Sequence, residues 1–339
     1  VEVAAEVGRG DGGARLVALS KNPRTAPEAA ELATAILRAH AGEDGGSGGA
    51  RGDALPSTAT LKRILHVLCK STKRKRAMQA LRLLEAGARA GVRVGAAAER
   101  AVATAVALRG EPERALVLMQ GLQARGDAVG LETYTAVMRG FSADRTSCAR
   151  AQVLFERMVS ADGIAPDTRA MNAAATAYVT AGDVRGAEEF VDRMCAKHGL
   201  EPDVTTHNVL LYGWSRAGDL TAALERAREV LLPADCSPAR PTLGTYVSLA
   251  HAYARAGDER RAARLLLVSA VRSGLRPTTA SWTEAAQGAA EAGQVTATRR
   301  MLEYMEASRG GCPPPTGKTY AAIAGALARA GRVEAARDV

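Results

Sequence analysis

The chain has 339 residues, a formal net charge of +9 and an isoelectric point of about 9.6. Aromatic residues make up only 4% of it, no apolar run approaches the roughly 18 residues that a membrane-spanning helix needs, and the cysteine spacing suits neither a disulfide framework nor a zinc site. These features exclude membrane-spanning and disulfide-rich classes, and the charge favours an acidic partner, with nucleic acid ahead of an anionic membrane surface.

Much of the positive charge comes from arginine, whose planar guanidinium suits phosphate recognition better than the lysine ammonium does. A GC-rich genome, which favours arginine, alanine and glycine codons, is an equally good source of this composition. We expect reduced, mostly structural thiols at the five cysteines, Cys69, Cys148, Cys195, Cys236 and Cys312.

The N-terminal part contains two helix-like stretches, 14–19 and 27–40, which predict a degenerate helical segment over residues 1–40. Residues 41–55 include Gly-Gly-Ser-Gly-Gly and are typical of a flexible linker, with a long loop inside a helical stack as the alternative. The chain starts with Val rather than Met and ends within a repeat, so we expect a segment of a longer protein.

Residues 56–130 carry a weak repeat, in which Pro56 and Thr72, and Val94 and Gly110, are each sixteen residues apart. The basic run at residues 70–76 joins the two helices expected in its first hairpin. Such a cluster either contacts an RNA backbone or forms a solvated turn. The candidate backbone contacts are Lys73, Arg74, Lys75 and Arg76, which would form one basic face with Lys62, Arg63 and Arg100.

Residues 131–339 repeat more clearly, with a proline followed sixteen residues later by a glycine. Successive prolines are 36, 39, 36 and 38 residues apart, and the last repeat is incomplete. A unit of this length cannot bury its apolar face alone, so the period predicts stacked helical hairpins. The proline–glycine pairs are Pro166–Gly182, Pro202–Gly218, Pro241–Gly257, Pro277–Gly293 and Pro315–Gly331.

Each hairpin is expected to contain two helices, which we name helix A and helix B. We take the residue after the proline as the last of one repeat and number the next repeat from there. Positions 4, 7, 8 and 11 then form one apolar stripe on helix A, and the glycine ends that helix because it adopts a left-handed conformation at little cost. The bulky residues at position 4 are Met171, His207, Tyr246, Trp282 and Tyr320.

Two stretches carry a family resemblance: Pro166-Asp167 through Asn172 to Ala181-Gly182-Asp183, and Pro202-Asp203 through Asn208 to Ala217-Gly218-Asp219. They resemble the pentatricopeptide repeat family, and the resemblance covers about residues 56–339 and is strongest from 131 onward. The tetratricopeptide repeat, a protein binder, is the nearest rival, but the glycine it expects within helix A is missing here.

The resemblance implies an all-α, right-handed solenoid that holds single-stranded RNA, with one base for each repeat. Position 5 and the last residue of a repeat would face the base edge. Thr135 with Asp167 resembles a guanine-reading pair, Asn172 with Asp203 a uracil-reading pair, and Asn208 with Thr242 a weaker pyrimidine reader. With RNA running 5′ to 3′ along the repeats, these pairs read guanine, uracil and a pyrimidine. At position 2, Arg169 would stack on a base through its guanidinium plane.

The other repeats depart from this pattern. At position 5, Val247 offers no hydrogen-bond donor, and Ala321 has no side chain that could read a base. Three read bases contribute roughly 3–9 kcal/mol, and a three-base word occurs about once in 64 positions, too often to specify one transcript. Either further repeats extend the code, or this stretch belongs to a larger assembly. The pairs that fit no familiar code are Lys62 with Gly95, Arg100 with Gly130, Val247 with Thr278, and Thr283 with Thr316.

Motifs for chemistry are weak. The stretch from Cys312 to Thr319 is one residue short of a phosphate-binding loop, but its three prolines supply no N–H groups, so it predicts an inter-repeat loop. Cys195 and His198 have half of a metal-site spacing, without a second pair. We therefore predict no catalytic residue, no metal ligand, no cofactor and no enzymatic activity.

The function expected from the resemblance is binding of single-stranded organellar RNA for its processing, stability or translation, in a mitochondrion or plastid. The alternative is a structural subunit of an organellar ribosome, or of another ribonucleoprotein assembly, that contacts rRNA and neighbouring proteins. A solenoid that binds only protein is the third class. None of these partners is a membrane or a small-molecule substrate.

Overall fold

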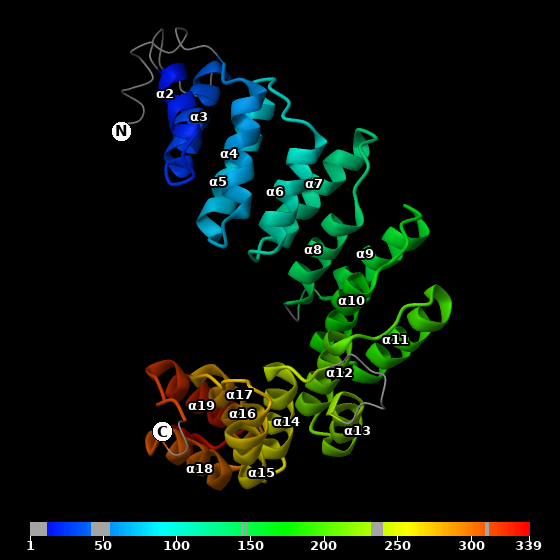
Figure 1. Ribbon diagram of the computed structural model, residues 1–339, viewed down its shortest axis with the longest axis vertical. Helices are drawn as coiled ribbons and strands as arrows, with labels where there is room; N and C mark the ends of the chain where they lie inside the picture. The colour runs from blue at the N-terminus through cyan, green and yellow to red at the C-terminus, as the bar shows by residue number, and fades with distance from the viewer. Residues whose placement is uncertain (1–11, 42–54, 144–145, 147, 232–239, 309–311) are drawn as a thin grey trace. The chain divides into compact units, whose positions relative to one another are not determined.

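The computed structural model describes residues 12–41, 55–143, 146, 148–231, 240–308 and 312–339, and within these ranges every element is a helix (Figure 1). The all-α prediction is therefore confirmed for the described part of the chain. The glycine-rich segment 42–54, Cys236 and the loop around it, and the turn at 144–145 lie outside the described residues. No described helix combines the length and hydrophobicity needed to cross a bilayer.

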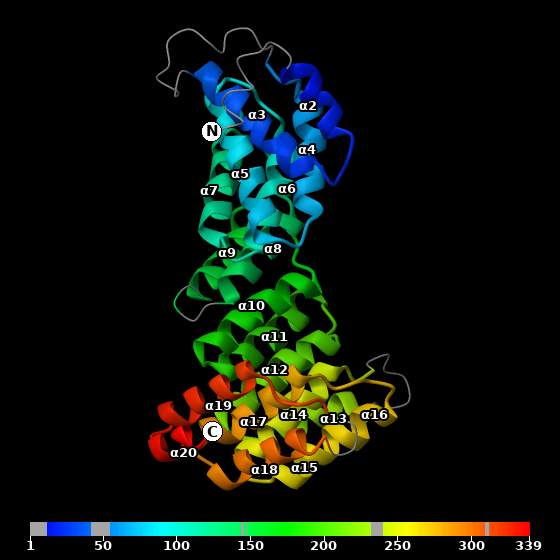
Figure 2. The same cartoon turned by 90° about the vertical axis from the view of Figure 1, so that its left-hand side faces the viewer.

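The chain forms two compact units, Val1–Pro166 and Asp167–Val339, each a stack of helical hairpins. The N-terminal helix-like stretches form α2 and α3. The hairpins of the first unit are α2 (Gly12–Ser20) with α3 (Ala26–Ala41), α4 (Thr58–Lys70) with α5 (Arg74–Arg89), α6 (Ala96–Ala107) with α7 (Pro112–Ala124), and α8 (Leu131–Ser142) with α9 (Cys148–Ser160). In this unit consecutive helices A pack on one another, and helices B lie along the other side of the unit, where α3 packs on α5 and ion pairs link α5 and α9 to α7 (Figure 2).

The second unit repeats this arrangement, with α10, α12, α14, α17 and α19 as consecutive helices A (Figure 1). One helix B contains a π-helical turn, η2 (Leu265–Ser269), and continues as α16 (Ala270–Arg272). The hairpins are α10 (Thr168–Ala181) with α11 (Val184–His198), α12 (Val204–Ala217) with α13 (Leu220–Leu231), α14 (Leu243–Arg255) with α15 (Glu259–Arg264), α17 (Thr279–Glu291) with α18 (Val295–Glu306), and α19 (Gly317–Arg329) with α20 (Val333–Arg337).

The last residue of a repeat is the N-cap of the next helix A. Asp167 accepts a hydrogen bond from the Ala170 backbone N–H at 2.7 Å, and Asp203 accepts one from Thr206 at 2.8 Å. Thr278 and Thr316 cap α17 and α19 in the same way. Because Asp and Thr satisfy the free N–H groups of a helix start, this position has a structural role before any ligand is considered.

Glycine ends helix A as the sequence pattern predicts. Gly182 and Gly218 have φ values of 94° and 85°, and each donates its N–H back to the last turn. The first four proline–glycine repeats of this unit therefore turn into helix B at the same point: the glycines with positive φ include Gly182, Gly218, Gly257 and Gly293.

A second set of glycines, which the sequence analysis missed, lies at position 10 of helix A. A Cβ on Gly213 would lie 3.0 Å from the Val179 side chain of α10, and a Cβ on Gly288 would lie 2.7 Å from the backbone oxygen of His251 on α14. Successive helices A approach so closely that a methyl group has no room there.

The core is built mainly from alanine, with a few large side chains. In the C-terminal repeats Trp282, Met301 and Met305 are buried among alanines of α14 and α17. Small residues bring the helix backbones together, and the large side chains fill the space between helices A and B. The low aromatic content is therefore compatible with a continuous core.

Candidate nucleic-acid interface

The structure joins position 5 of one repeat to the last residue of that repeat. Asn172 Nδ2 donates to Asp203 Oδ1 at 3.0 Å, and the Thr206 hydroxyl donates to Asn172 Oδ1 at 2.7 Å. In the next repeat Asn208 Nδ2 donates to the Thr242 hydroxyl at 2.9 Å. Four of the predicted site residues thus meet as the two pairs that were expected, one in each repeat.

The first pair presents a negative charge held in a fixed position. Burial works against ionisation, but hydrogen bonds from the Thr206 backbone, Asn172 and the Thr206 side chain together hold the pKa of Asp203 below its usual value. Asp203 is therefore ionised at neutral pH and can only accept hydrogen bonds. Asn172 is only 6% exposed and already uses both ends of its amide, so it must rearrange to contact a base directly.

The second pair is more open. Asn208 is half-buried and Thr242 is exposed. The Thr245 hydroxyl donates to Asn208 Oδ1 at 2.7 Å, as Thr206 does to Asn172 one repeat earlier. The two repeats thus hold an asparagine amide in the same way, and they differ in presenting a carboxylate in one case and a hydroxyl in the other.

The third predicted pair stays a prediction. Thr135 is buried in α8, where its hydroxyl donates to the Leu131 carbonyl at 2.8 Å. Asp167 belongs to the second unit, caps α10 and accepts from Arg169 Nε at 3.0 Å. Thr135 belongs to the first unit and Asp167 to the second, so their pairing stays a prediction. Arg169 is exposed, and its stacking role also stays a prediction.

Comparison with known proteins supports this arrangement. Residues 153–215 match the pentatricopeptide repeat domain, and the crystal structure of the pentatricopeptide repeat protein PPR10 from maize covers 98% of this chain with 27% identity and a TM-score of 0.59. The chain therefore contains a pentatricopeptide repeat domain at residues 153–215 and has the fold of a pentatricopeptide repeat protein.

A second structure, PPR10 in complex with an 18-nt psaJ RNA element, covers 93% of the chain with 22% identity and a TM-score of 0.54, and shows the same fold. The chain spans 44% and 50% of the lengths of these two solved chains. No curated protein matches the sequence.

The N-terminal repeats place cations at position 5. A Cβ built on Gly95 would lie 4.0 Å from Lys62 Nζ, and Arg100 Nη1 donates to the Ala128 carbonyl at 2.9 Å, close to Gly130. The geometry that joins position 5 to the end of the repeat therefore extends into the first unit. Lysine and arginine can contact phosphate there, and neither matches a base-reading pair.

The basic run has a different location from Lys62 and Arg100. Lys73 is the exposed residue before α5, Arg74 forms an ion pair with Glu111 at the start of α7, and Lys75 lines a cleft between α3 and α5. Arg76 follows on α5 and is half-buried.

The cleft between α3 and α5 has a volume of about 450 Å³, and Arg38 and Arg82 also line it. Helices B lie on the opposite side of this unit from α4 and α6 (Figure 2). The expected continuous basic face is therefore divided: Lys75 lies with helices B, whereas Lys62 and Arg100 lie with helices A.

A cluster that the sequence analysis missed lies on helices A of the second unit. Tyr212 and Arg216 of α12, Thr283 and Gln287 of α17, and Lys318 of α19 line one cleft of about 560 Å³. Four of them fall at positions 5, 9 and 13, one helical turn apart, on the same face as the reading residues. That spacing is the signal that could have found them.

A buried histidine lies near Arg216 of this cluster. His251 on α14 is 3% exposed, its Nε2 lies 4.0 Å from Glu291 Oε2, and its Nδ1 has no hydrogen-bond partner among the described residues. Burial lowers the pKa of His251 to about 4, with Arg216 and Arg255 acting in the same direction and Glu291 opposing them. The histidine is therefore neutral at physiological pH.

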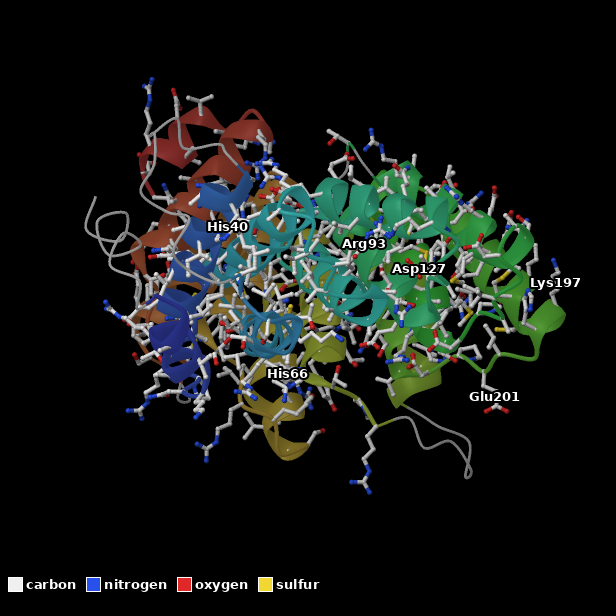
Figure 3. All side chains as sticks on the ribbon, turned by 90° about the horizontal axis from the view of Figure 1, so that it is seen from above. His40, His66, Arg93, Asp127, Lys197 and Glu201 are labelled. Carbon is white, nitrogen blue, oxygen red and sulfur yellow. The ribbon has the colours of Figure 1, made fainter. Side chains whose placement is uncertain are left out.

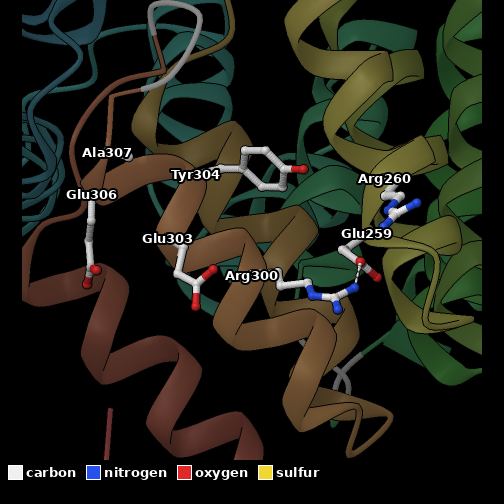
Figure 4. A pocket seen from close by; sticks show the side chains of 7 residues that line it. All are labelled: Glu259, Arg260, Arg300, Glu303, Tyr304, Glu306 and Ala307. Carbon is white, nitrogen blue, oxygen red and sulfur yellow. Dashed lines mark hydrogen bonds and ion pairs between the residues drawn. The ribbon is translucent and has the colours of Figure 1, made fainter.

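Another cleft lies on helices B of the C-terminal repeats. Arg300 forms an ion pair with Glu259 across it, and Glu303 and Tyr304 line the same cleft of about 560 Å³ (Figure 4). Its charged groups are partly paired with one another, and no nucleophile lies beside a base. This cleft therefore offers no arrangement for catalysis.

The weaker motifs form no site within the described residues. His66 is exposed on α4 (Figure 3), while burial raises the pKa of the Cys69 thiol to about 11, which disfavours the thiolate that a metal needs. No group of three or more His, Cys, Asp or Glu residues in the described ranges has metal-binding geometry. In the loop from Cys312 to Thr319, Thr316 caps α19 and Cys312 is buried.

Proposed function

We propose that the chain binds single-stranded RNA along its helices A and reads bases with Asn172–Asp203 and Asn208–Thr242. The observation that carries this proposal is the repeated geometry of the two pairs, in which an asparagine amide is held against the N-cap of the next helix A. Unpaired bases present their hydrogen-bonding edges, which such side chains can distinguish.

The first pair fits uracil by its chemistry. Uracil carries one N–H donor between two carbonyl acceptors, and the ionised Asp203 can only accept. The Asn172 amide supplies both donors and an acceptor once it turns from its present partners. The neutral Thr242 hydroxyl both donates and accepts, so the second pair should discriminate less.

The test uses an Asp203→Asn variant of the whole chain. Asparagine caps a helix as well as aspartate does, so the fold is kept while the acceptor charge is lost. The protein is bound to labelled oligoadenylates that carry either a uridine or a guanosine at the centre. We expect its preference for the uridine oligonucleotide to fall by about 5- to 150-fold in the variant, the range for one read base. Fluorescence anisotropy measures this preference.

The matched control is Asp183→Asn, because Asp183 caps helix B (α11) in the same way that Asp203 caps helix A. Asn172→Ala is the second test variant. If both Asp203→Asn and Asn172→Ala bind with the affinity and base preference of the wild type, the base-reading proposal is wrong.

A structural role in a ribonucleoprotein assembly is the second candidate, and the cleft of Arg38, Lys75 and Arg82 favours it. This basic surface lies with helices B, where RNA read by helices A would not reach it. Co-sedimentation with ribosomal subunits in an organellar extract separates the candidates, because a factor bound to a single transcript would run in lighter fractions.

We further infer a mitochondrial or plastid location and a role in RNA processing, stability or translation, because the family acts chiefly in these organelles. A fluorescent fusion of the complete gene product, followed together with markers for both organelles, tests the location. Uniform cytosolic fluorescence would contradict it.

A further inference from the structure

Helix α14 is covered on every side. Eight consecutive residues, from Thr245 to Ala252, are buried, which is more than two helical turns and therefore includes all faces of the helix. Val247, at position 5, is only 4% exposed. The corresponding residues before and after it in the stack, Asn208 and Thr283, are half-buried and reach the surface.

The helices on either side of α14 meet above it. Figure 1 shows α14 between α12 and α17 in the stack, yet Arg216 Nη2 of α12 lies 3.7 Å from Glu291 Oε1 of α17. Arg255, at the end of α14, lies 3.5 Å from the other oxygen of Glu291. The close approach of Gly288 to His251 brings α17 down onto α14 and allows this contact.

A cleft beside this contact, which Arg216 also lines, has groups that suit a nucleotide. The guanidinium of Arg216 lies 5.8 Å from the centre of the Tyr212 ring and donates to its hydroxyl at 3.2 Å. An aromatic ring and a guanidinium plane therefore lie next to each other, and a base can stack on either group. The Thr283 hydroxyl and the Gln287 amide supply hydrogen-bonding groups on the facing helix, and Lys318 supplies a positive charge.

The acidic groups of the cleft do not prevent an anion from approaching. Glu291 faces both Arg216 and Arg255, so its charge is compensated. Glu284 also lines the cleft, where burial raises its pKa and Arg216 opposes this effect. Counting Lys318, the cations outnumber the carboxylates.

We infer that the cleft of Tyr212, Arg216, Thr283, Gln287 and Lys318 holds the nucleotide that directly follows the one read by Asn208 and Thr242, and that the repeat containing Val247 reads no base. The inference rests on the proposed RNA binding and deepens it. Consecutive nucleotides would then contact α12 and α17, and the base count would be one less than the repeat count in this region.

Photocrosslinking with 4-thiouridine tests the path. The whole chain is bound to a short oligoadenylate with a central uridine–cytidine step, with 4-thiouridine at the first or the second position on the 3′ side of the cytidine. We expect the first position to crosslink to peptides of α12 and α17, and neither position to crosslink to α14. A crosslink from the first position to the α14 peptide overturns the inference.

A protein–RNA double-mutant cycle is the second measurement. Removing the base at the first position should weaken binding to the wild type by about tenfold, which is typical of one stacked base. Tyr212→Ala should show almost none of this loss, because the stacking surface is already gone. An equal loss in wild type and variant would contradict the inference.

Val247→Asn is the matched change in the covered repeat, and Val247→Ala keeps the site apolar in case asparagine disturbs the core. Neither should create a base preference at any position, because residue 247 is buried. A new preference in Val247→Asn would show that this repeat does read RNA. If the wild type binds none of these oligonucleotides, the proposed function fails, and this inference fails with it.

Discussion

At the scale of single residues, the chain uses polar side chains that are already partly engaged. Asn172 holds Asp203 and accepts from Thr206, while Thr283 shares a hydrogen bond of 3.0 Å with Thr319. Such pre-formed contacts fix the side chains before a ligand arrives and lower the entropy cost of binding, although the contacts must be exchanged for those to the base.

His251 gives the clearest prediction at this scale. Its pKa is about 4 in the folded state and 6.5 in an exposed state, so the unfolded chain takes up the proton first as the pH falls. The stability that this histidine contributes is complete above pH 6.5 and is lost as the pH falls toward 4, by about 3 kcal/mol at most.

A His251→Leu variant should therefore lose less stability than the wild type between pH 6.5 and 4. Melting temperatures measured across this range check the prediction, and the difference between the two proteins removes the contribution of carboxylates that titrate in both. Parallel curves for wild type and variant would contradict it.

At the scale of helices, the small residues at position 10 set how closely helices A stack. Gly288→Ala would place a methyl group 2.7 Å from the backbone oxygen of His251, and backbone cannot move aside as a side chain can. We expect a loss of about 1–3 kcal/mol in stability, larger than the gain of up to about 1 kcal/mol in helix propensity.

Gly325→Ala in α19 is the matched control. Its methyl group would meet only the end of the Arg329 side chain at 3.4 Å, so the propensity gain should dominate and the melting temperature should rise slightly. Thermal unfolding followed by circular dichroism measures both variants. A Gly288→Ala protein as stable as the wild type would show that the helices separate freely.

At the scale of the whole molecule, the distribution of cations predicts which surface meets the RNA backbone. Each phosphate contact makes the negative slope of log K, the RNA-binding constant, against log salt concentration steeper by about 0.7 for a single strand. If RNA follows helices A, the double variant Lys62→Ala, Arg100→Ala should make the slope shallower by about 1.4, while Lys75→Ala, Arg82→Ala leaves it unchanged. The reverse result would show that the RNA backbone binds along helices B.

The sequence predicted the parts of this molecule that depend on one repeat. The spacing from Pro202 to Gly218 predicted helix A and its end, and the shared register predicted that Asn172 and Asp203 would face the same base; the hydrogen bond between them was not predicted. The contact of Arg216 with Glu291 could not be predicted in this way, because it depends on how strongly the stack curves around α14. Curvature arises from packing between repeats, to which spacing within a repeat is insensitive.

Under the proposed function, the residue that ends each repeat has two tasks, since it starts the next helix and would also face the base. Asp203 and Thr316 both satisfy backbone N–H groups, and few other residue types can do so. If this position reads RNA, its side chains come chiefly from Asp, Asn, Ser and Thr, because the glycine that caps α6 and α8 offers no side chain to a base. Evolution has a wider choice at position 5, where Asn208, Val247, Thr283 and Ala321 already differ.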